Sequence, residues 1–334
     1  MEERKKVLIM NIVKPRMHIL RAQQFASPRV IFDYFDLADR IRKKADDHIG
    51  IMEMKKLLEG YKMYEIFYEE STRTRFSFWS AGEMLGMGIC FTEDATKFSS
   101  VAKGESLEDT IRILAGQRPS VIVLRHPETG AAERAAAVID KYYAGKVAII
   151  NAGDGIGQHP TQALLDVYTI WRRLNRLDNI TVVIGGDLAN GRTCRSLAYS
   201  LSKFNGVKII FISPPELAMG QDITDHLNES GTEWTVANDL NKAIPEADVV
   251  YWTRVQKKRL IDQSRFVEFR DAFHIGLKEM KLFKPEAILM HPLPRVGEIS
   301  TEVDDLPQVA FFEQADNGQY IRAALLLKIF GLEI

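Results

Sequence analysis

Residues 64–79 have the sequence YEIFYEESTRTRFSFW, and this stretch decides the fold class. The apolar run at 64–68 is short and predicts a strand buried on both faces, as strands of parallel sheets are. A helical pattern follows, with Phe78 on its apolar face. Between strand and helix, residues 71–75 bring hydroxyls, backbone N–H groups and guanidinium groups to a helix N-terminus, which suits a phosphate dianion. The alternative is a plain Ser/Thr cap with solvated arginines.

Six further apolar runs of the same kind alternate with helical patterns, at 120–124, 147–150, 180–184, 207–212, 249–252 and 287–290. Their spacing leaves room for crossover helices, so we expect an α/β fold with mainly parallel sheets. A chain of 334 residues predicts two domains. We expect them to be residues 1–158, with a C-terminal helix at 317–334 packing back on them, and residues 159–316.

Composition excludes several classes of protein. The net charge is −1, with 46% hydrophobic and 27% charged residues, so neither a disordered chain nor a basic nucleic-acid binder is expected. Cys90 and Cys194 are far apart and form no metal-binding pair, which favours a reducing cytoplasm. No apolar stretch is long enough to cross a bilayer, and we expect no membrane partner.

Two more strand ends carry polar groups. Arg125 and His126 end the run at 120–124, where a surface Arg–His pair is the alternative. A glycine-rich loop after the run at 147–150 leads to His159 at a helix start, with Gln162 one turn on. An imidazole there can donate to a developing oxyanion, or it can simply cap the helix.

The segment after the run at 180–184, GGDLANGRT, is one residue away from a P-loop, because Arg192 stands where lysine is needed. The run at 249–252 ends in Thr253 and Arg254 and not in the aspartate that a P-loop NTPase would also want. A dinucleotide fold would need G-x-G-x-x-G, and residues 153–158 do not supply it. Both alternatives fail on a specific residue.

The last constellation has two parts. Arg254 and Gln256 alternate on an extended segment, so both can point at a ligand carboxylate. The segment HPLPR at 291–295 is stiffened by two prolines, and its carbonyls are available to an amino group. A simple turn after a strand is the alternative for this segment.

From about His18 to Leu327 the chain resembles the aspartate/ornithine carbamoyltransferase family. The resemblance rests on seven motifs in family order: STRTR at 71, RHP at 125, HPTQxLLD at 159, GDLxxGRT at 186, TRVQ at 253, HPLPR at 291 and QAxNG at 314. It implies a carbamoyl-phosphate domain and an amino-acid domain, joined by interdomain helices. It also implies a homotrimer with shared sites and no metal or cofactor, and leaves open whether regulatory chains dock.

The implied activity is transfer of the carbamoyl group of carbamoyl phosphate to L-aspartate, which gives N-carbamoyl-L-aspartate and phosphate in pyrimidine biosynthesis. The implied catalytic residues are Arg73, Thr74, Arg125, His159 and Lys103. Carbamoyl phosphate would be held by these together with Ser71, Thr72, Ser99, Gln162 and the Leu293 carbonyl. Aspartate would be held by Lys103, Arg192, Arg254, Gln256, Leu293 and Pro294.

Other activities stay open. The ornithine branch carries a cysteine where this chain has Pro292. Two carboxylates need cations, which Arg192, Arg254 and Lys103 supply, so aspartate is favoured. A carbamoyltransferase for another amino acid, or a catalytically silent paralogue serving as an interaction subunit, is the alternative. The chain departs from the family pattern at Glu70, Ala102 and Gly297, which keeps the silent paralogue open. Glu70 matters most, because a carboxylate beside a phosphate pocket weakens phosphate binding unless it points away.

Overall fold

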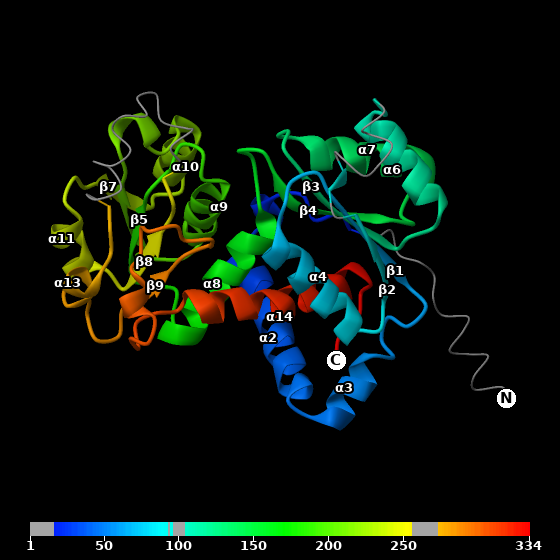
Figure 1. The fold of residues 1–334 in the computed structure, drawn as a ribbon, viewed down its shortest axis with the longest axis horizontal. Helices are drawn as coiled ribbons and strands as arrows, with labels where there is room; N and C mark the ends of the chain where they lie inside the picture. The colour runs from blue at the N-terminus through cyan, green and yellow to red at the C-terminus, as the bar shows by residue number, and fades with distance from the viewer. Residues whose placement is uncertain (1–16, 93, 96–103, 256–272) are drawn as a thin grey trace. The chain divides into compact units, whose positions relative to one another are not determined.

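The computed structural model describes residues 17–92, 94–95, 104–255 and 273–334. The chain divides into two compact units. The first comprises the residues up to Gln24, Phe32–Pro160 and Gln319–Ile334, and the second comprises Phe25–Ile31 and Thr161–Gly318. The helices α2 (Pro28–Ala45) and α14 (Phe311–Ile329) each have several residues in both units, and the chain passes from one unit to the other within them (Figure 1).

The first unit is built on a four-stranded parallel sheet with the order β2-β1-β3-β4. Its strands are β1 (Lys62–Phe67), β2 (Gly88–Phe91), β3 (Val121–His126) and β4 (Ala148–Asp154). Its helices are α3 (His48–Met54), α4 (Thr72–Met84), α6 (Leu107–Gly116) and α7 (Ala131–Tyr143), with a 3-10 turn at Ala22–Gln24.

Helices cover both faces of this sheet (Figure 1). On one face, α6 and α7 pack against residues such as Ile66 and Leu124 in one apolar cluster. On the other face, α4 comes so close that a Cβ at Gly82 would lie 2.8 Å from the side chain of Met63. Burial on two faces explains why the central strands are continuous apolar runs.

The second unit holds a five-stranded parallel sheet with the order β7-β6-β5-β8-β9. Its strands are β5 (Thr181–Gly185), β6 (Lys208–Ile212), β7 (Glu233–Val236), β8 (Val249–Trp252) and β9 (Ile288–Met290). Its helices are α8 (Pro160–Leu174, which starts in the first unit), α9 (Arg192–Leu201), α10 (Gln221–Glu229), α11 (Leu240–Ala243) and α13 (Leu277–Met280), with 3-10 turns at Pro215–Leu217, Ile244–Glu246 and Thr301–Val303.

The core of the second unit also lies on both faces of its sheet. Val250 and Trp252 share one cluster with α11 and α13, while Tyr251 between them points the other way, toward α8. The predicted fold class, two domains that each contain a parallel sheet flanked by helices, is confirmed. All seven predicted strands are present, within two residues at their starts.

Two strands were not predicted, and both are edge strands. β2 and β7 are exposed at most positions, so their sequences GICF and EWTV lack the buried run that marks the central strands. Within the described part of the chain, no helix is both long and apolar enough to cross a membrane.

Candidate active site

The strand order of the first unit reverses beside β1. The chain passes from β1 to β2 on one side and then adds β3 on the other side of β1. Ligands of open α/β sheets bind beyond the carboxyl ends of the strands at such a reversal. The segments that follow β1 and end β3 here are Ser71–Arg75 and Arg125–His126, which are the residues that the sequence singles out.

The N-terminus of α4 carries the predicted phosphate ligands. Ser71 is the N-cap residue, but its side chain makes no capping hydrogen bond, so the alternative of a plain cap is wrong for this hydroxyl. Thr72 and Arg73 are exposed, while Thr74 is buried in the first turn. First-turn N–H groups have no partner within a helix, and the helix dipole favours an anion there.

The guanidinium of Arg125 is held from two sides. Its Nη2 lies 3.2 Å from Oε2 of Glu69, and its Nη1 donates to the Ala152 carbonyl at 3.1 Å. The side chain of Arg125 is only 14% exposed. Beside it, His126 is buried against the ring of Tyr68, and this burial lowers its pKa. The alternative of a surface Arg–His pair is therefore wrong.

The loop before His159 is organised by a buried carboxylate, Asp154. Its Oδ1 accepts from the side-chain amide of Asn151 at 3.1 Å and from the backbone N–H of Gln158 at 2.7 Å. Its Oδ2 accepts from the N–H of Gly130 at 2.8 Å. These bonds fix the chain immediately before His159, which is itself buried at the start of α8.

The strand order of the second unit reverses between β5 and β8. Gly186 follows β5 with φ +106, and a Cβ there would lie 2.1 Å from the Thr253 carbonyl oxygen, so only glycine fits. Arg192 begins α9 after this turn, and Arg254 follows β8; both are half-buried. Two predicted carboxylate ligands therefore stand at the ends of neighbouring strands.

A buried carboxylate, Asp166, joins three segments of the second unit. It accepts hydrogen bonds from Gln162, Tyr251 and Gln314 at 2.8, 2.8 and 2.7 Å. Gln314 in turn accepts from the N–H of His291 at 2.9 Å, in the segment predicted to offer the Leu293 carbonyl.

The residues that hold the predicted ligands, Glu69, Asp154, Asp166 and Tyr251, were not predicted from the sequence as site residues. Only Asp166 gives a sequence signal, because it stands four positions after Gln162 on one helix face.

Several predictions concern residues that the structure does not describe. Ser99, Ala102, Lys103 and Gln256 lie outside the described residues. Of the two departures that are described, Glu70 is exposed and Gly297 has a φ of +99 in an exposed turn. Pro294 is exposed beside Leu293.

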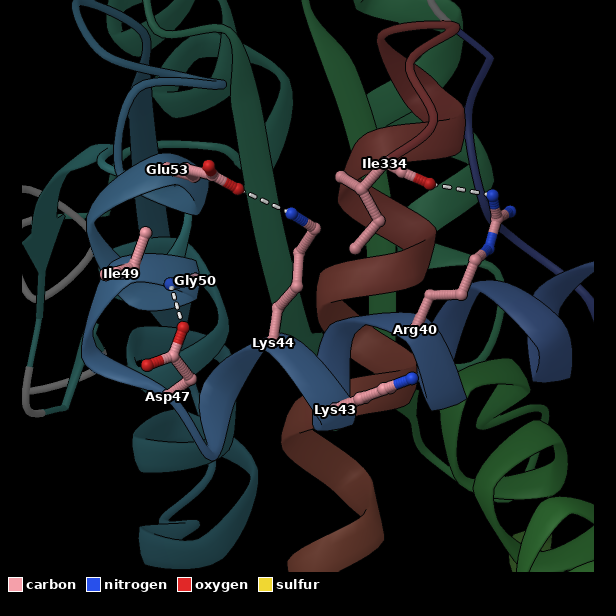
Figure 2. A pocket seen from close by; sticks show the side chains of 8 residues that line it. All are labelled: Arg40, Lys43, Lys44, Asp47, Ile49, Gly50, Glu53 and Ile334. Carbon is pink, nitrogen blue, oxygen red and sulfur yellow. Dashed lines mark hydrogen bonds and ion pairs between the residues drawn. The ribbon is translucent and has the colours of Figure 1, made fainter.

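A hollow on the first unit lies between α2, α3 and Ile334, and its lining includes none of the predicted site residues that the structure describes (Figure 2). Its cations are largely used internally, because Lys44 pairs with Glu53 at 2.6 Å and Arg40 donates to the Ile334 carbonyl at 2.7 Å. These two contacts join α2 to α3 and to the C-terminal residue.

Comparisons with known proteins agree with this geometry. Residues 17–172 match the carbamoyl-P binding domain of the aspartate/ornithine carbamoyltransferase family, and residues 178–329 match its Asp/Orn binding domain. A relative from Pisum sativum, named aspartate carbamoyltransferase 1, chloroplastic, is 47% identical over 92% of this chain and 77% of its own length.

Two solved structures have the same fold. The catalytic subunit of aspartate transcarbamoylase from Methanocaldococcus jannaschii is 40% identical with a TM-score of 0.81, over 93% of this chain and 97% of that chain. Aspartate transcarbamoylase from Trypanosoma cruzi, in complex with carbamoyl phosphate and aspartate, is 35% identical with a TM-score of 0.85, over 96% and 98%. The chain belongs to the aspartate/ornithine carbamoyltransferase family, and it is a transferase.

Proposed function

We propose that this protein transfers the carbamoyl group of carbamoyl phosphate to the amino group of L-aspartate. The observation that carries the proposal is the position of the predicted anion ligands at the strand-order reversal of both sheets. The first reversal offers a helix N-terminus and Arg125, and the second offers Arg192 and Arg254. The two family domains that the chain matches are described as a carbamoyl-P binding domain and an Asp/Orn binding domain, which agrees with one anion site in each unit.

Carbamoyl phosphate has two sets of ligands in this proposal, one for its phosphate and one for its carbamoyl group. Ser71, Thr72, Arg73 and Thr74 hold the phosphate, together with Ser99 and Lys103 of the neighbouring chain, two residues that lie outside the described part of this chain. Thr74, Arg125 and His159 contact the carbamoyl oxygen, and Gln162 and the Leu293 carbonyl contact the carbamoyl NH2 group. Aspartate is bound by Lys103, Arg192, Arg254, Gln256, Leu293 and Pro294. Residues 1–158 with 317–334, and 159–316, are the corresponding domains.

The reaction follows from these charges. The aspartate amine attacks the carbamoyl carbon, an oxyanion forms, and phosphate leaves with the amine proton, because phosphate is the nearest strong base. Arg125 can stabilise the oxyanion without moving, since Glu69 and the Ala152 carbonyl already hold its guanidinium. Pre-organised donors of this kind carry most of the catalysis in acyl transfer.

Aspartate is favoured over ornithine because the second site is cationic. Arg192 and Arg254 attract carboxylates and repel an ammonium side chain. Pro292 stands at the position of the ornithine-branch cysteine and offers no thiol. The exposed position of Glu70 removes the main argument for a silent paralogue, because an exposed carboxylate is largely screened from a bound phosphate.

The test is an incubation of the purified protein with carbamoyl phosphate and a panel of amino acids, followed by identification of the carbamoylated product. We expect N-carbamoyl-L-aspartate and no citrulline. Turnover of ornithine at a comparable rate would contradict the assignment of the substrate, and no carbamoylated product from any amino acid would contradict the activity.

We further propose a homotrimer with active sites shared between neighbouring chains. Support comes from three exposed aromatic side chains on α4 and β2 of the first unit. Phe76, Trp79 and Phe91 are 52%, 39% and 46% exposed, with ring centroids 5.6 and 5.9 Å apart along the row. A contiguous aromatic surface next to an active site is typical of a subunit contact. Light scattering should give three times the chain mass, and Trp79→Glu should lower it.

The compartment that we propose is the cytoplasm. Cys90 and Cys194 are both free, which is the state that a reducing compartment maintains. Localisation of the tagged, full-length protein in its own cells tests this proposal, since the Pisum sativum relative is named chloroplastic.

A further inference from the structure

We propose that Asp166 is a positioning residue of the transfer reaction, which aims two hydrogen-bond acceptors at the NH2 group of carbamoyl phosphate. The acceptors are Oε1 of Gln162 and the carbonyl of Leu293. The inference rests on the proposed function and deepens it. It makes one buried carboxylate responsible for the preference of the site for a carbamoyl group over an acetyl group.

Asp166 lies on α8 with no exposed surface. Its Oδ1 accepts from Nε2 of Gln162 at 2.8 Å and from Nε2 of Gln314 at 2.7 Å. Its Oδ2 accepts from the hydroxyl of Tyr251 at 2.8 Å. An ionised carboxylate can only accept, so each of the three partners must present a donor to it. Burial and the charge of Asp166 raise the pKa of Tyr251, which keeps this phenol a donor.

The carboxylate thereby dictates the orientation of the Gln162 amide. Because Nε2 is bound to Asp166, Oε1 faces the other way and is the end that a ligand meets. With the amide reversed, Oε1 would lie against a buried carboxylate oxygen, which is repulsive in a site of low dielectric constant. Gln162 is thus fixed as an acceptor, the partner that an NH2 group requires.

The same carboxylate orients Gln314. Its Nε2 is bound to Asp166, so its Oε1 accepts from the N–H of His291 at 2.9 Å. His291 then accepts at Nδ1 from the N–H of Leu293 at 2.7 Å, and its Nε2 donates to Glu298 at 2.8 Å. This chain of bonds fixes the peptide that leads into Leu293, whose carbonyl is the second proposed acceptor.

Two fixed acceptors discriminate between carbamoyl phosphate and acetyl phosphate. Acetyl phosphate carries a methyl group in place of NH2, so binding it leaves both acceptors buried without a donor. If the side chain of Gln162 were free to turn away from the ligand, its oxygen would not be left without a donor. The preference for carbamoyl phosphate over acetyl phosphate would then fall. The preference therefore reports on the orientation of the amide and not on the integrity of the phosphate site.

The experiment measures dissociation constants of both acyl phosphates by calorimetry, with the full-length protein. Asp166→Ala should lower the preference for carbamoyl phosphate over acetyl phosphate by on the order of tenfold, with inorganic phosphate affinity unchanged. Gln314→Met, which removes the second amide at similar length, should lower the preference as well. When Gln162 is already alanine, the additional change Asp166→Ala should lower this preference less than it does in the wild-type protein, because the amide that Asp166 orients is then absent.

Thr169→Val is the matched control. Thr169 is equally buried on α8, donates to the Leu165 carbonyl at 2.8 Å and accepts from Asn317 at 2.8 Å, without touching Gln162. It should lower the melting temperature and leave the preference unchanged.

A folded Asp166→Ala protein that keeps the wild-type preference would overturn the inference. If that variant does not fold, Gln314→Met decides by the same criterion. A wild-type protein that binds no carbamoyl phosphate would instead overturn the proposed function, and the inference with it.

Discussion

The replacement of Arg125 by methionine tests the proposed catalytic geometry most directly. The guanidinium is nearly buried, and two of its nitrogen atoms are engaged by Glu69 and by the Ala152 carbonyl. Methionine keeps the length and the apolar contacts of the side chain and removes every donor. Arg125→Lys keeps the charge, but one nitrogen atom cannot replace a planar group that reaches two protein partners and a ligand.

The size of the effect follows from what the guanidinium does. Loss of one pre-organised oxyanion donor costs a factor of about 10²–10³ in kcat, which is about 2.7–4 kcal/mol. We expect this for Arg125→Met and a smaller loss for Arg125→Lys. Arg134 provides the matched control because it pairs with Glu108 and Glu128 at 2.9 Å each, but its side chain is 44% exposed. Arg134→Met should change stability by less than about 1 kcal/mol and activity hardly at all.

Initial rates of N-carbamoyl-L-aspartate formation, measured over a range of carbamoyl phosphate concentrations, separate kcat from KM. Calorimetry with inorganic phosphate then reports on the phosphate site alone, which Arg125→Met should leave within about threefold of wild type. Melting curves exclude a folding defect. Retention of kcat within about fivefold in Arg125→Met, or equal losses of kcat and of phosphate affinity, would refute the assignment of Arg125 to the carbamoyl oxygen.

Three further predictions concern other parts of the chain. Arg254→Ala should lower kcat/KM for aspartate by an amount equal to about 2–4 kcal/mol and leave the affinity for carbamoyl phosphate unchanged. If calorimetry shows that both ligands lose affinity equally, Arg254 has a structural role. The variants His159→Ala and Lys103→Ala should each be inactive alone. When the two are refolded together, roughly a quarter of wild-type activity should return, because each mixed trimer holds one intact shared site. If the mixture stays inactive while separately refolded wild type regains its activity, the sites are not shared. Burial raises the pKa of Glu65 to about 8 from 4.5, so its contribution to stability is lost as the pH rises from 4.5 to 8. Glu65→Gln should therefore raise the melting temperature more at pH 8 than at pH 5, while exposed Glu59→Gln should not; an equal shift at both pH values would count against a buried, protonated carboxyl.

The central strands could be predicted because their physical cause is local. A strand buried on both faces is apolar at most positions, and the run at 249–252 coincides with β8. The edge strands β2 and β7 have no such signature, since their pairing depends on the neighbour that β1 or β6 provides. Their existence is a property of the sheet and not of their own residues.

The polar ligands could be predicted for a different reason. In parallel sheets all carboxyl ends lie at one edge, so the polar residues that directly follow an apolar run are candidates on the strength of the sequence alone. Ser71–Arg75, Arg125 and Arg254 were found in this way, and the strand orders place them at the two reversals. Which strands are neighbours was not predictable, and that order is what singles out β1 with β3 and β5 with β8.

The carboxylates that orient these ligands are hard to recognise from the sequence because each has at least one partner that is distant along the chain. Asp166 meets Tyr251 85 positions away and Gln314 148 positions away, and Asp154 meets Gly130 24 positions before it. A buried carboxylate destabilises the folded protein unless several hydrogen-bond donors surround it. Each of these carboxylates is therefore compatible with only one arrangement of the segments around it. The same requirement makes these acids useful, because a group that tolerates one arrangement holds a glutamine amide or a histidine loop in the orientation that the ligand needs.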